Sequence, residues 1–277
     1  MSCRPRFARL LPLWGLALAC LACATTSPAP PLAPPEAARP TVGVPYRALP
    51  AVEPMKLLLL PVPNKPIVSV RLVFRSGSVD DPRGKEGLTA LTTRLLLEGG
   101  TKSLNSAQFL EALYPLAAEL NFDTDKEFTT ITGRVHQDRF PRFLTLLAEA
   151  LLAPRLEDKE FRRLRSQQLN LVKNRLRQED DEELSKVALD GLLYEAHPYR
   201  HFTQGTEAGL SALTLEDVKA QWKGAFTQER LIIGLAGAGD EALAAQVKTT
   251  LGALLATGLS RVDLPSASGI RGRTLII

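Results

Sequence analysis

The sequence predicts an α+β domain, a two-layer sandwich in which helices pack on a mostly antiparallel sheet. Residues 67–74 and 128–135 alternate between apolar and other side chains, which is the pattern of strands with one buried face. Residues 137–152 and 241–255 instead repeat apolar residues at helical spacing. Because strands and helices follow one another in mixed order, a helical layer on one sheet is expected.

Composition allows a large core and argues against nucleic acid as a partner. The chain has 277 residues, of which 45% are hydrophobic, enough for one large domain or two small ones. Its formal charge is +4, but Arg4, Arg6 and Arg9 stand together in a segment without acids. The rest of the chain is close to neutral, so no basic footprint for nucleic acid is present.

Residues 1–23 are typical of a bacterial signal peptide of the lipoprotein type. Three arginines precede the apolar stretch Leu10–Ala22, which is too short for a good membrane span. Cys20 and Cys23 each follow small residues, as in a lipobox, so either could carry the lipid. We expect an exported protein of the bacterial cell envelope, an outer-membrane lipoprotein that faces the periplasm and is held there by its lipid anchor. Ordinary signal cleavage and an uncleaved anchor are the alternatives.

The rest of the chain divides into three parts. Residues 24–53 are rich in Pro and Ala and read as a semi-extended tether, or as an unstructured leader with no role. Residues 54–258 form the predicted domain. Residues 259–277 read as a linker and the start of a missing second domain. The third cysteine, Cys3, also lies in the signal region, so the folded part has no disulfides.

The strands are predicted from short apolar or alternating runs. Residues 56–61 and 67–74 are separated only by the turn Asn64–Pro66, so they are expected to form an antiparallel pair. Residues 120–122 form a third strand and residues 128–135 a fourth. A fifth, 231–236, has the composition of a buried strand.

The helices are predicted from apolar periodicity and from capping residues. Thr101–Asn105 caps a helix that runs to about Tyr114, and Thr214–Asp217 opens another. A charged helix begins with acids at Glu157 and continues with bases to about Arg177, the order that suits a helix dipole. That basic run reads as a solvated helix face, with binding to anionic lipid as the alternative. The predicted helices cover residues 87–97, 105–114, 137–152, 157–177, 180–193, 214–223 and 241–255.

The helix at 87–97 is preceded and followed by recognisable segments. Residues 77–87, called here the lead segment, contain Gly77-Ser78 and Asp81-Pro82, and Gly100-Thr101 follows the helix. This arrangement resembles the insulinase/pitrilysin family of zinc peptidases, which place H-x-x-E-H on a helix between such segments. Weaker matches support the resemblance over residues 54–258: the helix around 161–165, His197-Pro198-Tyr199, Gly205-Thr206 and residues 213–217.

The residues of the zinc motif are missing from this helix. Ala90 stands where the family has its first His, Thr93 where it has the catalytic Glu, and Arg94 where it has the second His. Alanine has no donor atom, threonine is no base near neutral pH, and a guanidinium repels Zn²⁺. An ion pair of Arg94 with Glu98, four residues on, would account for the arginine.

The third zinc ligand of the family, a Glu from a later helix, is missing as well. Its position falls at Asn170 or Leu171, and neither is a carboxylate. The sequence therefore predicts no catalytic residues, no metal ligands and no zinc. His197 and His201 are four residues apart, but Pro198 between them breaks the helix that a metal pair would need. We expect His197 in a packed loop and His136 at the surface or in a cap.

The resemblance also implies partners. Relatives enclose substrate between two homologous domain pairs, so we expect a non-catalytic subunit that pairs with an active zinc peptidase homologue and helps to form its peptide chamber. The strand residues Asn121, Phe122, Asp123 and Thr124 match an edge strand on which the family binds extended peptides through the backbone. An ordinary sheet strand is the alternative for this segment. For the whole chain the alternatives are a stand-alone peptide-binding lipoprotein, a zinc metalloendopeptidase with an unusual site, and a truncated fragment without function.

Overall fold

A computed structural model describes residues 47–48, 55–194, 197–254 and 258. The predicted signal peptide, the lipidation residues Cys20 and Cys23, most of the tether and residues 259–277 lie outside the described residues. Within them, no helix is both long enough and apolar enough to cross a membrane.

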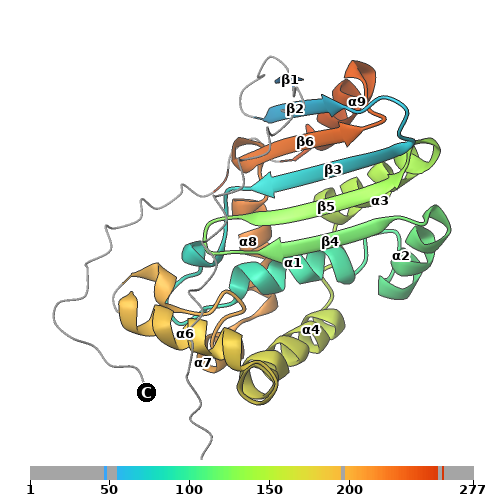
Figure 1. The fold of residues 1–277 in the computed structure, drawn as a ribbon. Coiled ribbons are helices and arrows are strands. Elements are labelled where there is room, and N and C mark those ends of the chain that lie inside the picture. Colours follow the sequence, from blue (N-terminus) through green and yellow to red (C-terminus); the bar gives the residue numbers. More distant parts are fainter. Residues whose placement is uncertain (1–46, 49–54, 195–196, 255–257, 259–277) are drawn as a thin grey trace, which may run out of the picture. The chain divides into compact units, whose positions relative to one another are not determined.

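The sheet has six strands in the order β1-β2-β6-β3-β5-β4 (Figure 1). Every neighbouring pair is antiparallel except β2 and β6, which run parallel. The predicted α+β sandwich with a mostly antiparallel sheet is therefore confirmed. β1 lies inside the segment predicted to be a tether and pairs with β2. The strands are β1 (Arg47–Ala48), β2 (Lys56–Pro61), β3 (Ile67–Phe74), β4 (Glu119–Thr124), β5 (Thr129–His136) and β6 (Leu231–Gly237).

The predicted antiparallel pairing of the first two long strands is wrong. β6, from far along the chain, lies between β2 and β3 and pairs with both, so that Leu235 is opposite Leu59 on one side and Val70 on the other. The connection after β2 passes the end of β6, where the Val62 N–H donates to the Gly237 carbonyl (2.9 Å). An almost wholly apolar strand gains most from a central position, which explains the insertion.

The helices follow the predicted pattern with three differences. The predicted charged helix at 157–177 is interrupted by a π-helical turn, Leu171–Arg175. A short helix at Glu207–Ala212 was not predicted, and the last helix ends at Leu251 rather than near residue 255. The α-helices are α1 (Leu88–Glu98), α2 (Ser106–Leu113), α3 (Phe140–Leu152), α4 (Asp158–Asn170), α5 (Leu176–Gln178), α6 (Asp181–Leu193), α7 (Glu207–Ala212), α8 (Leu215–Ala225) and α9 (Glu241–Leu251).

Two apolar clusters hold the layers together, and α1 contributes to both. In the first, one face of the sheet packs on α3 and α9, and alternate residues of β3 such as Val70 and Leu72 are buried. The second joins α1 to α4, α7 and α8 through Leu91, Phe161 and Leu210. Figure 1 shows α1, α3 and α8 behind the strands. Because α1 is packed on both sides, its residues are held firmly relative to the sheet and to α4.

Candidate functional site

Asp81 fixes the start of α1 from the lead segment. Its carboxylate accepts hydrogen bonds from the backbone N–H of Gly87 (2.7 Å) and of Thr89 (2.8 Å), and from the Thr89 hydroxyl (2.6 Å). The first turn of a helix leaves such N–H groups without intrahelical partners. Burial raises the pKa of Asp81 to about 7, although the bonds from Thr89 and Gly87 act in the opposite direction.

Gly87, the last residue before α1, can only be glycine in this structure. Its φ is +100°, and a Cβ there would lie 2.7 Å from the Leu210 side chain and 2.8 Å from the Gln204 carbonyl oxygen. The chain thus approaches the α7 region more closely than any side chain would allow. The lead segment therefore keeps the geometry that positions α1.

The first two motif positions are closed to solvent. Ala90 and Thr93 are both buried on α1. The Thr93 hydroxyl donates to the Thr89 carbonyl (2.9 Å) and lies 3.3 Å from the hydroxyl of Thr124 on β4. The side chain at the position of the catalytic Glu therefore has a structural contact with the end of the edge strand.

This contact belongs to a chain of hydroxyl groups that crosses the sheet edge. The Thr124 hydroxyl lies 3.5 Å from that of Thr129 on β5, which in turn donates to the Ser76 carbonyl (2.8 Å). All of these groups are buried, where each polar atom needs a partner. The chain of hydroxyls fixes the end of β4 against α1.

Arg94, at the position of the second His, connects α1 to α4. Its guanidinium binds Glu98, with Nη2 3.1 Å from Oε2, which confirms the predicted ion pair. The same Nη2 donates to Oε1 of Gln167 on α4 at 3.0 Å. A metal would join α1 to the later helix through three ligands; here one arginine does so.

Asn170 and Leu171, the two candidates for the third ligand, line a pocket of about 600 Å³ together with Arg94. Asn170 is exposed at the end of α4, and its Oδ1 accepts from Nδ2 of Asn174 (2.7 Å). Leu171 is half-buried and begins the π-helical turn. The structure thus brings the position of the second His and the two third-ligand positions to one pocket, which Ala90 and Thr93 do not line.

The residues at this place do not fit zinc. An alanine, an arginine that is already paired and an asparagine or leucine offer no set of three ligands. Across the part of the chain that the structure describes, no group of three or more His, Cys, Asp or Glu side chains could hold a metal ion. No metal-dependent step can be built from these positions.

β4 forms one edge of the sheet, since among the described strands it pairs with β5 alone. Asn121 and Asp123 point to the exposed side, Phe122 is half-buried and Thr124 is buried. The edge position agrees with the expectation for these four residues. Peptide binding by them stays a prediction.

An apolar groove beside β4 was missed by the sequence reasoning. A pocket of about 960 Å³ lies between β4, α2 and the end of α1, and Phe122, Leu97 and Phe109 line it. At its rim Leu110 is 69% exposed and Tyr114 is 85% exposed, the two highest values among the large apolar residues described. The signal was available, because α2 has apolar residues on more than one face.

The histidines are structural in their contacts. His197 is buried, its Nδ1 accepts from the Tyr199 N–H (3.1 Å), and its ring packs on Tyr194 and Tyr199. The packed loop predicted for it is confirmed. Burial lowers the pKa of His201, whose Nδ1 lies 3.1 Å from the Phe202 carbonyl oxygen.

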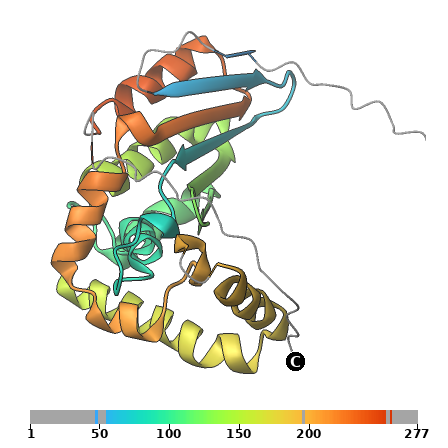
Figure 2. The ribbon, with the colours of Figure 1, turned by 90° about the vertical axis from the view of Figure 1, so that its left-hand side faces the viewer.

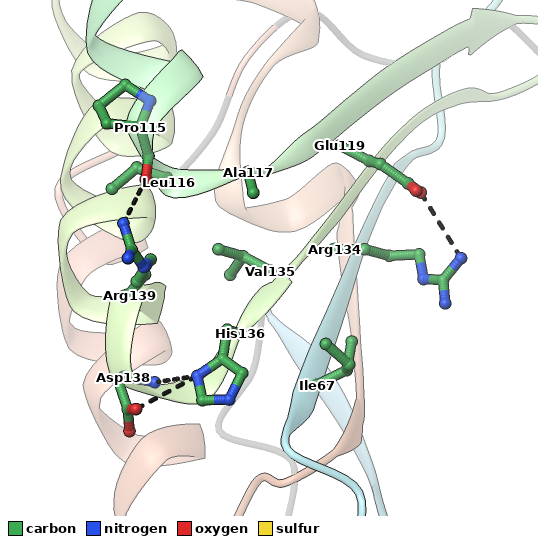
Figure 3. A pocket seen from close by; sticks show the side chains of 10 residues that line it. All are labelled: Ile67, Pro115, Leu116, Ala117, Glu119, Arg134, Val135, His136, Asp138 and Arg139. Carbon is green, nitrogen blue, oxygen red and sulfur yellow. Dashed lines mark hydrogen bonds and ion pairs between the residues drawn. The ribbon is translucent and has the colours of Figure 1, made fainter.

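His136 lines a separate pocket of about 480 Å³ at the far end of β4 (Figure 3). Its Nδ1 accepts from the Asp138 N–H and so caps a 3₁₀ turn, as predicted. Glu119 faces Arg134 across the same pocket at 3.5 Å, and Arg139 donates to a main-chain carbonyl. The charged side chains of this pocket thus have partners within it, either another side chain or a main-chain group.

Comparisons with known proteins agree with this description. The family model "Insulinase (Peptidase family M16)" matches residues 57–200. "Non-peptidase homolog YmxG" of Helicobacter pylori is 28% identical over 173 residues, which is 62% of this chain and 39% of that protein. "Protease 3" of Salmonella typhimurium is 28% identical over 166 residues, 60% of this chain and 17% of that protein.

Two solved structures share the fold. A peptidase M16 inactive domain from Pseudomonas fluorescens matches with a TM-score of 0.74 and 22% identity. A protease from Helicobacter pylori matches with a TM-score of 0.67 and 17% identity. In each case 81% of this chain and 54% of the other are covered, so the chain spans about half of these structures and less of the curated relatives. The resemblance stated from the sequence is confirmed.

Proposed function

Because this chain belongs to the insulinase family, peptidase family M16, and is a non-catalytic member of it, we propose that it holds extended peptides for an active zinc peptidase homologue. In this proposal the two chains form a hetero-oligomer, and the present chain supplies part of the peptide chamber. Its place is the bacterial cell envelope, where the lipid anchor expected at Cys20 or Cys23 would hold it.

The observation that carries the proposal is the edge strand β4 beside an apolar groove. An added peptide strand would hydrogen-bond to the outer backbone groups of β4, a mode that needs no metal. Successive side chains of a strand point to opposite faces. Every second side chain of the peptide would therefore enter the groove lined by Leu97, Phe109 and Phe122.

Retention of the scaffold without the ligands supports a holding role rather than a cutting one. Gly87 and Asp81 still set the start of α1, and the hydroxyls of Thr93 and Thr124 hold the end of β4. A chain of this kind contributes to proteolysis only when another chain supplies the zinc site. The partner is therefore expected to carry an intact H-x-x-E-H motif.

Peptide binding can be tested on the chain alone. A fluorescein-labelled peptide of alternating valine and threonine is expected to bind, as measured by fluorescence anisotropy, and Leu110→Glu should weaken binding at least tenfold. Leu58→Glu is the control, because Leu58 is another exposed leucine, 40% accessible, but lies on β2 and does not line the groove. If both variants bind the peptide equally well, the groove is not the peptide-binding site.

Pairing requires a separate test. The tagged chain is recovered from detergent-solubilised envelope, and co-purifying proteins are identified by mass. An H-x-x-E-H homologue in equal amount supports the hetero-oligomer. If the chain is recovered alone, yet binds the peptide, the stand-alone peptide-binding lipoprotein becomes the better description, and the groove on this single chain is the observation that favours it.

A further inference from the structure

Helix α6 is as long as the other major helices, but none of its residues is buried. All of its 13 residues are exposed or only partly covered. By comparison, α8 and α9, each with 11 residues, bury several side chains. A helix of this length is marginal in water unless tertiary packing supports it. The described part of the chain gives α6 little of that support.

The attachment of α6 to the rest of the domain is loose. Asp190 forms an ion pair with Lys126 of the β4–β5 turn (3.0 Å), and the helix otherwise packs mainly on α5 and the turn at Pro198–Arg200. Beneath its first turn lies the pocket of about 600 Å³, which Glu183 and Leu176 line. Figures 1 and 2 place α6 at the end of the helical layer, away from the sheet.

The side of α6 that points away from the domain carries an apolar strip among exposed charged residues. Ser185, Ala188, Leu189 and Leu192 recur at helical spacing and are all exposed; we call them the α6 strip. Leu189 is 40% exposed and Leu192 is 44% exposed. The helix thus has a second face fit for packing, and nothing in the described residues covers it.

Charge narrows what could cover the α6 strip. The run Glu179–Glu183 consists of five acids, and residues 179–193 hold six acids and one base. This charge repels anionic lipid and nucleic acid. It also opposes packing of α6 on the same helix of a second copy, because like charges would meet.

We propose that the α6 strip is the surface on which the partner peptidase homologue docks. The partner's contact surface would be an apolar patch flanked by lysine and arginine. The inference rests on the proposed pairing. It goes further by naming the docking surface and the kind of contact that would form there. Hydrophobic contact at Leu189 and Leu192 would supply affinity, and the acids of the first turn would steer and orient the partner.

The test compares full-length variants in the same envelope pull-down. Leu189→Glu with Leu192→Glu should reduce recovery of the H-x-x-E-H homologue at least tenfold, and the paired change of both leucines to alanine should reduce it less. Leu58→Glu, at a leucine of β2 that is 40% exposed, is the control and should leave recovery unchanged. Because both α6 residues are exposed, circular dichroism should show intact folding.

The possible outcomes distinguish an error in the proposed docking surface from an error in the proposed pairing. If wild type and the double glutamate variant recover the homologue equally, the surface is wrong while pairing stands. If wild type recovers none, pairing fails and the inference fails with it. A photo-crosslinker at position 189 that captures a second copy of the chain would overturn the inference. Binding of wild type to phosphatidylglycerol vesicles, lost in the double variant, would overturn it too.

Discussion

The guanidinium of Arg94 and the side-chain oxygen of Gln167 lie 3.0 Å apart, and this contact joins α1 to α4. Arg94 occupies the position at which active relatives are expected to have a zinc-binding His. Its second partner, Glu98, holds the guanidinium along the helix. Loss of the metal is thus accompanied by a new polar connection between the same two helices.

Removing this connection should measurably destabilise the domain. Arg94→Ala is expected to lower the free energy of unfolding by about 1 kcal/mol, because it removes a partly buried ion pair and an interhelical hydrogen bond. Arg162→Ala is the control, since its pair with Asp158 is more exposed, and should cost less than about 0.5 kcal/mol. Urea unfolding measures both. Equal losses would show that Arg94 does not connect the helices.

Restoring the ligands should restore metal binding without activity. A triple variant with Ala90→His, Arg94→His and Leu171→Glu is expected to bind one zinc ion per chain, because residues 90 and 94 are one turn apart on α1 and Arg94 and Leu171 line the same pocket. Hydrolysis should stay absent, because Thr93 offers no general base. Competition with a chromogenic chelator measures the affinity.

The same experiment can decide which residue matches the third ligand. Replacing Leu171→Glu by Asn170→Glu should weaken zinc binding, since Asn170 is exposed and bonded to Asn174, whereas Leu171 is half-buried. Tighter binding by the Asn170 version would assign the position the other way. No binding by either would mean that the backbone has moved since the ligands were lost.

Asp81 should make stability depend on pH in an unusual direction. Its pKa is about 7 in the fold against an ordinary 3.8, so the protonated form is favoured by folding. Its stabilisation is complete below pH 3.8 and is lost as the pH rises to about 7. Relative to Asp81→Asn, the free energy of unfolding of wild type should fall by roughly 1 kcal/mol per pH unit over this range.

The asparagine variant isolates this effect from other groups. Burial lowers the pKa of His201, so its contribution is lost as the pH falls through the ordinary histidine range, the opposite direction. That contribution is common to both proteins and cancels in the difference. A wild-type free energy of unfolding that rises relative to that of Asp81→Asn as the pH rises would contradict the raised pKa of Asp81.

Gly87 and Gly84 allow a matched test of backbone geometry. Both have positive φ, +100° and +77°, but a Cβ at Gly84 would meet nothing within 4 Å, whereas one at Gly87 would meet Leu210 and Gln204. Gly84→Ala should cost about 1 kcal/mol for the conformation alone. Gly87→Ala should cost about 3 kcal/mol, because a steric clash is added. Thermal unfolding of the two variants is the measurement, and similar losses would remove the steric argument.

Local sequence signals located most elements of this domain. The alternation in β3 and the apolar spacing in α3 appear in the structure at the predicted residues, because they record which side of each element is buried. Asn105 and Thr214 cap helices as predicted, since capping depends on atoms within three residues. The absence of zinc ligands likewise needed only the identities of the residues at the motif positions.

Other features depend on residues far apart in the sequence. Nothing near β2 or β3 indicates that β6 separates them, because strand pairing is chosen by the whole sheet. The partners of Arg94 and Thr93 on α4 and β4 depend in the same way on how α1 packs, as does the groove beside β4. The sequence by itself determined the family, the local elements and the missing ligands, all of which are properties of neighbouring residues. Only the tertiary structure decided the strand order, the contacts that replaced the metal and the faces left open, because these arise when distant segments exclude water from one another.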